Sequence, residues 1–168
     1  MLCESMDPKP RLLGFNYKAL VRYLVQPNHL VACRYYVGSV KRNSHSKKSE
    51  KMYADQQKLL AALEQHGIEH VLGALIRHPD ETFHEKGVDV RLAVEMIRLA
   101  RQNVYDTAYL ISSDTDLVAA IEEVQSFGKT VQYIGTAKGQ SFGLTKVADD
   151  TRLLRLEDIR QFFPSTLL

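Results

Sequence analysis

The stretch LISSDTDLVAAIEEVQSFGKTVQYIG, residues 110–135, decides the fold. It joins two short apolar runs, residues 107–112 and 130–135, through a segment with helical periodicity that ends near Gly128. The residues that this helix is expected to turn inward are Leu117, Val118, Ile121 and Val124. A buried strand, a helix and a second buried strand in this order predict a parallel pair joined by a crossover helix.

Outward from this unit, strand and helix patterns keep alternating. Helices are expected over residues 15–25, over a segment from about Met52 to Gly67, and over 88–102, 141–150 and 157–163; strands are expected over 29–40, 68–78 and 152–156. This order predicts an α/β fold of the Rossmann-like kind, with a mainly parallel sheet between two helical layers. We expect an irregular segment over 1–14 and one domain over 15–168.

The overall composition indicates little about function. The formal net charge is +2, which is too small to indicate a nucleic-acid partner by itself. Its two cysteines, Cys3 and Cys33, lack the spacing of a zinc site or a disulfide framework. No run approaches the about 18 apolar residues of a membrane span, and the N-terminus has no signal-peptide pattern, so a cytoplasmic protein is expected.

Acidic residues stand where two predicted helices begin. Asp114 and Asp116 follow a buried strand directly, and Asp89 lies in the first turn of the helix that starts at residue 88. Helix capping and the helix dipole explain each acid singly. Two aspartates at i and i+2 in one turn are more than capping requires. Carboxylates gathered at the carboxyl edge of a sheet can bind Mg²⁺ or Mn²⁺, and such a metal site can catalyse hydrolysis of a phosphodiester.

A basic segment precedes the second predicted helix. Its cations are Lys41, Arg42, Lys47, Lys48 and Lys51. Such a segment neutralises backbone phosphates without reading sequence, although a solvated charge run is the alternative. Beside an acidic metal site, the combination favours an RNA-like polyanion. The glycine-containing stretch 135–143 has no Walker-A pattern and is interpreted as a turn.

Three segments together resemble the NYN domains, a branch of the PIN-like nucleases. They are KGVDVRLAVEMI at 86–97, the stretch 110–135, and SFGLTKVADDTRLL at 141–154. The resemblance implies a PIN-like fold and a ribonuclease that depends on Mg²⁺ or Mn²⁺. It assigns catalysis to Asp89, Asp114 and Asp116, and metal binding to these three and Asp149.

The chain departs from this family at its beginning. NYN domains open with a strand that carries a D-G-x-N-like motif, and no apolar strand with this motif stands here. We therefore expect such a strand to be encoded before Met1, or to be supplied by a partner or a second copy. The rival to the nuclease is an inactive NYN-like module that binds RNA or protein.

Overall fold

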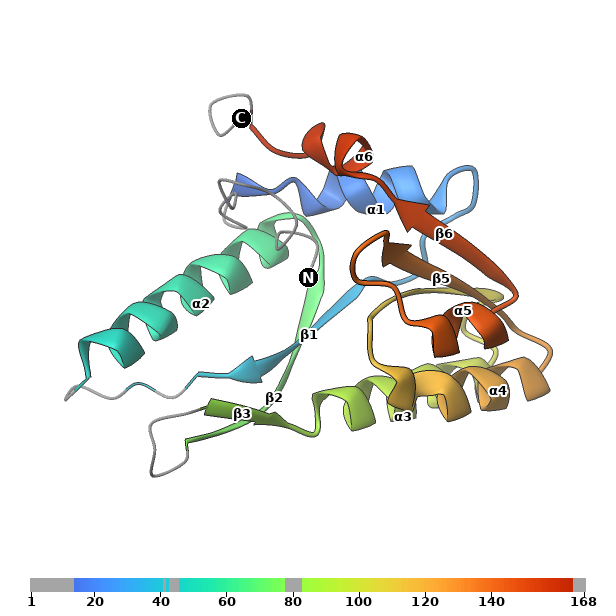
Figure 1. Ribbon diagram of the computed structural model, residues 1–168, viewed down its shortest axis with the longest axis horizontal. Helices are drawn as coiled ribbons and strands as arrows, with labels where there is room; N and C mark the ends of the chain where they lie inside the picture. Colours follow the sequence, from blue (N-terminus) through green and yellow to red (C-terminus); the bar gives the residue numbers. More distant parts are fainter. Residues whose placement is uncertain (1–13, 41, 43–45, 78–82, 165–168) are drawn as a thin grey trace. The chain divides into compact units, whose positions relative to one another are not determined.

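Strands of this protein form two three-stranded sheets, with orders β1-β2-β3 and β4-β5-β6. The computed structural model describes residues 14–40, 42, 46–77 and 83–164 (Figure 1). The strands are β1 (Arg34–Ser39), β2 (Glu69–Arg77), β3 (Phe83–Lys86), β4 (Thr107–Ile111), β5 (Thr130–Thr136) and β6 (Asp150–Leu154). All neighbours are parallel except β2 and β3. The predicted α/β fold with mainly parallel pairing is confirmed.

Helices follow the strands in the predicted alternation. They are α1 (Tyr17–Val25), α2 (Lys47–Gln65), α3 (Val88–Arg101), α4 (Val118–Ser126), α5 (Phe142–Val147) and α6 (Leu156–Arg160), with a 3₁₀ turn, η2 (Thr115–Leu117), before α4. By their contacts the residues divide into two compact units: unit 1 comprises Met1–Val31 and Leu92–Leu168, and unit 2 comprises Ala32–Arg91. One domain over 15–168 stays a prediction, and the first 13 residues of the segment 1–14 lie outside the described ones.

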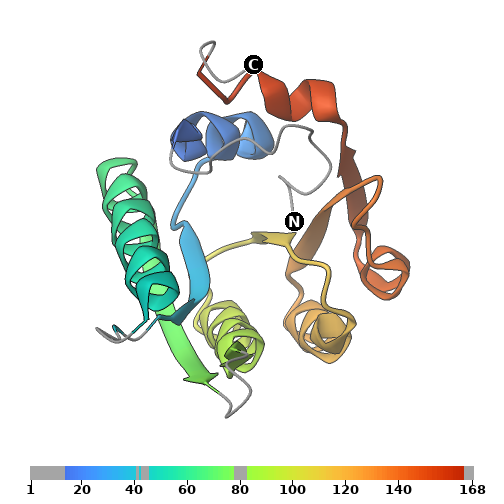
Figure 2. The same cartoon turned by 60° about the vertical axis from the view of Figure 1, so that its left-hand side comes forward.

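Unit 1 is built around the β4-β5-β6 sheet. Figures 1 and 2 show α1 and α6 on one face of this sheet and α3, α4 and α5 on the other. The residues buried together on the second face are Met96, Ala100, Leu110, Leu117, Ala120, Ile121, Val124, Val131, Tyr133 and Leu144. Three of the four residues predicted to face inward from 117–124 are in this set, and Val118 packs against it. Helical periodicity alone therefore predicted which residues of this segment face the core.

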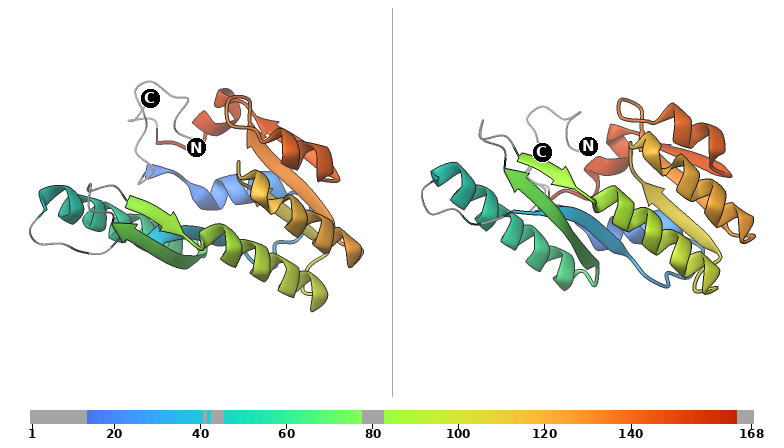
Figure 3. Two further views of the ribbon diagram at one scale, coloured as in Figure 1. Left: turned by 60° about the horizontal axis from the view of Figure 1, so that its bottom comes forward. Right: turned by 90° about the horizontal axis from the view of Figure 1, so that it is seen from below.

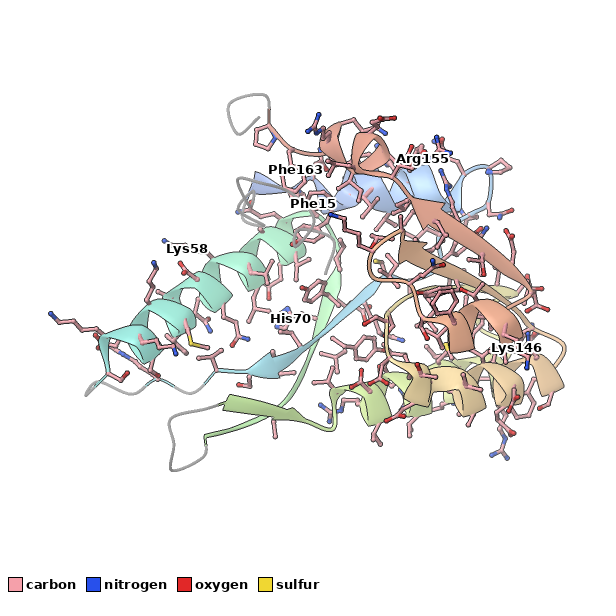
Figure 4. All side chains as sticks on the ribbon, viewed as in Figure 1. Phe15, Lys58, His70, Lys146, Arg155 and Phe163 are labelled. Carbon is pink, nitrogen blue, oxygen red and sulfur yellow. The ribbon has the colours of Figure 1, made fainter. Side chains whose placement is uncertain are left out.

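An aromatic cluster joins the two helices on the first face. The ring of Phe15 lies 4.8 Å from that of Phe163 and 6.1 Å from that of Phe162, both in edge-to-face geometry (Figure 4). The N–H of Asn16 donates to the carbonyl of Phe162 at 2.8 Å. Residues at the start and end of the described chain are thereby fixed to each other.

Unit 2 contains the β1-β2-β3 sheet and α2. The side-chain amide of Gln56, on α2, is buried and donates to the carbonyl of Gly38 at 2.6 Å, while its oxygen accepts from the N–H of Val40 at 2.8 Å. These bonds tie the helix to the end of β1. Figure 3 shows β3 leading directly into α3.

Three element predictions were wrong in detail. Strand β3 was not predicted, because four residues of mixed polarity carry no readable alternation. The second helix was expected to start at about Met52, but α2 begins at Lys47 because the Ser46 hydroxyl caps it by accepting from the N–H of Ser49. The late helix was predicted to run to residue 150, whereas α5 ends at Val147 and Asp150 opens β6.

No helix among the described residues has both the length and the apolar character that a membrane span requires.

Candidate functional site

The turn that follows β4 carries Asp114 and Asp116. The N–H of Asp114 donates to the Ser112 hydroxyl at 3.1 Å, and one carboxylate oxygen of Asp114 accepts from the N–H of Asp116 at 2.9 Å. These two bonds bend the chain out of the strand into η2, and Leu117, only 1% exposed, anchors the turn in the core. Both carboxylates therefore stand at the carboxyl edge of the sheet, as predicted from the sequence.

Neither carboxylate has a compensating cation in the described ranges. No Lys, Arg or His nitrogen there lies within 4.0 Å of Asp114 or Asp116. Asp114 uses one oxygen as a helix cap, which is the structural role considered above, and Asp116 is exposed. Capping thus explains half of one carboxylate and leaves three oxygens of the pair for a ligand.

A wall formed by the loop after β5 supports this turn. The hydroxyl of Ser141 lies 3.1 Å from that of Thr115, between the two aspartates, and the N–H of Ser141 donates to the Tyr133 hydroxyl at 2.8 Å. Glycine is required on both sides of this contact: a Cβ at Gly143 would lie 2.5 Å from Thr115 Cγ2, and one at Gly135 would lie 2.8 Å from the Tyr133 hydroxyl. Residues 137–139, within the stretch 135–143, form a turn, as interpreted, and the stretch also packs beside the acidic pair.

Asp149 stands at the opposite edge of the same sheet. Its carboxylate accepts from the side chain of Gln125 and from the N–H of Val131, at 2.9 and 2.8 Å. Val131 pairs with Ala108 near the start of β4, about 10 Å along the strand from Ile111 at its end. Asp149 therefore cannot share a metal ion with Asp114, and the expectation that it joins the metal ligands is corrected.

Hydrogen bonds also shift the titration of Asp149. The Gln125 side chain, followed by the Val131 N–H, holds the pKa of this carboxyl below its ordinary value of 3.8. The lowered pKa has a structural cause, since Gln125 ties the junction of α5 and β6 to α4 and Val131 ties it to the start of β5.

Asp89 lies in the first turn of α3 and is half-buried. Positions 89, 92, 93 and 96 share one helical face. Met96 belongs to the core of unit 1, and Leu92 and Ala93 pack against it. Asp89 thus lies one turn before Leu92 on the same side of α3, and by its contacts it belongs to unit 2.

The predicted RNA-binding cations lie in unit 2. Lys47, Lys48 and Lys51 are exposed on the first turns of α2, and Arg42 is exposed with a long contact of 3.9 Å to Glu50. Lys41 lies outside the described residues.

As for metal ligands, no group of three or more His, Cys, Asp and Glu side chains is gathered within the described positions. Within unit 1, the candidate metal ligands are Asp114 and Asp116. Their oxygen donors fit a hard cation such as Mg²⁺ or Mn²⁺, which binds one or two carboxylates and completes its shell with water. The supporting residues Tyr133, Ser141 and Gly143 were not predicted from the sequence. The only local signal for them was Ser141 itself, which caps α5 and stands two residues before a glycine.

Comparisons with known proteins agree with this architecture. The sequence model of the NYN domain matches residues 4–155. A crystal structure of a protein of unknown function from Vibrio parahaemolyticus is similar, with 22% identity, a TM-score of 0.64 and coverage of 86% of this chain and 81% of that one. None of the curated proteins matches the chain.

Proposed function

We propose that this chain, which belongs to the NYN domain family of PIN-like nucleases, is a metal-dependent ribonuclease that hydrolyses RNA phosphodiester bonds at the Asp114–Asp116 turn. The observation that carries the proposal is the pair of carboxylates at the carboxyl end of β4, without a cation partner among the described side chains. Ligands of open parallel sheets collect at this edge.

Asp114 and Asp116 are the proposed metal ligands. The bond from the Asp116 N–H occupies one oxygen of the Asp114 carboxylate and leaves the second for a ligand. Bound Mg²⁺ or Mn²⁺ would supply Lewis acidity and a water of lowered pKa. The wall formed by Ser141 and Gly143 keeps the turn in place through Thr115.

Asp89 is the proposed third acid. Helical periodicity puts it on the packing face of α3, one turn before residues that contact the core of unit 1. A carboxylate on that face, at the N-terminal end of the helix, is also favoured by the helix dipole. Its proposed role is to add negative charge for the metal.

Arg42, Lys47, Lys48 and Lys51, with Lys41 beside them in sequence, are the proposed RNA-binding cations. The helix dipole disfavours cations at an N-terminus, so Lys47 and Lys48 do not serve the stability of α2. Their exposure leaves them accessible to backbone phosphates. Replacing Lys47, Lys48 and Lys51 by Ala should weaken RNA binding across sequences and lower the salt slope of log Kd by up to about 3. An unchanged slope would assign these lysines to a solvated helix face.

Metal-dependent cleavage of single-stranded RNA tests the proposal. Wild-type protein is expected to cut with Mg²⁺ or Mn²⁺ and to stop on addition of a chelator. Asp114→Asn and Asp116→Asn should lose cleavage, whereas Asp149→Asn, a matched acid at the opposite sheet edge, should keep it. Salt-sensitive binding without cleavage would assign the protein to the RNA-binding alternative.

A further inference from the structure

Phe142 is the most exposed of the large hydrophobic side chains in the described segments, with 79% of its surface accessible. Single exposed apolar residues are common on protein surfaces, so exposure alone assigns nothing. The position of the ring suggests a role, because Phe142 is the first residue of α5, within the wall that supports the acidic turn.

Both chain neighbours of Phe142 contact Thr115. The Ser141 hydroxyl lies 3.1 Å from the Thr115 hydroxyl, and the backbone at Gly143 approaches so closely that a Cβ would lie 2.5 Å from Thr115 Cγ2. Thr115 itself stands between Asp114 and Asp116. The residues before and after Phe142 therefore both lie against the acidic turn.

This backbone is held in place before any ligand arrives. The N–H of Ser141 is bonded to the hydroxyl of Tyr133, a fully buried side chain, and the Ser141 hydroxyl accepts from the N–H of Leu144, which is also fully buried. An aromatic ring on a fixed backbone has few rotatable bonds to order on binding, so contact with it costs little entropy. Lys138, in the same loop, is exposed and adds a cation.

We propose that Phe142 is a nucleobase-stacking residue that holds an unpaired base next to the phosphate at the Asp114–Asp116 turn. The inference rests on the proposed ribonuclease function and adds to it a residue that contacts the bases of the substrate. A flat uncharged ring beside a site for phosphate matches the alternation of base and phosphate in a strand, and stacking accepts any base. A base inside a duplex already has both faces covered by its neighbours, so paired RNA is excluded from this contact.

Equilibrium binding of a short RNA that contains 2-aminopurine tests the proposal, with Ca²⁺ in place of Mg²⁺ or Mn²⁺ and with gel electrophoresis to verify that the strand stays intact. Wild-type protein should quench 2-aminopurine fluorescence by stacking. Phe142→Ala should lose the quenching and bind about 5- to 100-fold more weakly, and Phe142→Trp should restore both. Phe127→Ala is the matched control, since this ring is 38% exposed at the C-terminal end of α4, and it should bind as wild type.

Several results would overturn the inference. They are wild-type quenching and affinity in Phe142→Ala, equal affinity of wild-type protein for abasic and base-containing strands, and equal affinity for duplex and single strand. Loss of self-association in Phe142→Ala with unchanged RNA affinity would assign the ring to a protein contact and overturn it as well. Circular dichroism melting of Phe142→Ala should match wild type, because the deleted ring is exposed.

Failure of the ribonuclease proposal gives a different pattern. If no metal produces cleavage but Phe142→Ala loses quenching, the stacking role stands and the protein is an RNA-binding module. If cleavage depends on Asp114 and Asp116 while Phe142→Ala binds and cuts as wild type, the nuclease stands and the stacking role falls.

Discussion

Acids at the two edges of the β4-β5-β6 sheet have opposite surroundings. At the amino edge, Asp149 accepts from Gln125 and Val131, and Asp106 pairs with Lys129 at 3.0 Å. At the carboxyl edge, Asp114 accepts from one backbone N–H, and Asp116 has no cation near it among the described residues.

This difference separates carboxylates that serve the fold from carboxylates that await a ligand. A partnered carboxylate has its charge and hydrogen-bonding capacity satisfied by the chain that surrounds it. Two neighbouring carboxylates without a cation repel each other, and a bound metal ion relieves that repulsion. Substitutions at the two edges should therefore affect different measurements, stability at one edge and activity at the other.

The largest effect is expected on cleavage at the carboxyl edge. Asp114→Asn and Asp116→Asn should each lower the rate of RNA cleavage by about 100-fold or more, because each removes charge from the proposed metal site. Their free energies of unfolding should stay within about 0.5 kcal/mol of wild type, since no core volume is lost. Cleavage rates under single-turnover conditions and urea denaturation measure the two quantities. Undiminished metal-dependent cleavage in both variants would break the comparison.

The next effect is a loss of stability at the amino edge. Asp149→Ala should lower the free energy of unfolding by about 1–2 kcal/mol, because the Gln125 amide and the Val131 N–H lose their acceptor. Cleavage at 25 °C should remain near wild type. Urea denaturation with the same RNA assay checks this, and Glu122→Ala, which removes an exposed acid of α4, is the control. Loss of cleavage by Asp149→Ala under conditions in which the variant remains folded would place Asp149 back in the site.

A smaller effect is expected where the carboxyl edge has its own structural bond. Tyr133→Phe removes the acceptor of the Ser141 N–H and should cost about 1 kcal/mol of unfolding free energy. Because Ser141 supports Thr115, cleavage should also fall, by a few-fold rather than the hundredfold loss of the acid variants. Parallel denaturation and cleavage measurements test whether the wall positions the turn. A stability loss with no change in cleavage would show that the wall serves the fold alone.

The smallest effect concerns acid pH. Because the folded-state pKa of Asp149 is lowered, its ionised form contributes stability that is complete above the unfolded-state pKa and is lost as the pH falls through the folded-state value. The stability difference between wild type and Asp149→Ala should therefore be constant near neutral pH and shrink below about pH 4. Urea denaturation between pH 3 and 7 measures it. A difference that grows toward acid would contradict the assigned hydrogen bonds.

Sequence patterns predicted one edge well and the other poorly. The SSDTD motif directly follows an apolar strand, so its place at the carboxyl edge followed from parallel topology alone. Asp149 was misplaced because SFGLTKVADD has helical composition to its end, and only tertiary pairing of Asp149 with Gln125 and Val131 ends the helix early. The wall at Ser141 was missed for a related reason. Contacts such as Ser141 to Thr115 join residues 26 apart, which no local pattern encodes.

The buried amide of Gln56 has a consequence for how the β1 edge behaves toward other chains. Within a strand, Gly38 and Val40 present their backbone groups toward the same side, and a residue of an added parallel strand would bond the carbonyl of one and the N–H of the other. The Gln56 amide takes up that pair of bonds. Unpaired strand edges are templates for aggregation, and a side chain that imitates a strand residue closes the template at this point. In Gln56→Leu the carbonyl of Gly38 and the N–H of Val40 lose this partner and can pair with a strand of another chain. We therefore expect self-association that increases with protein concentration.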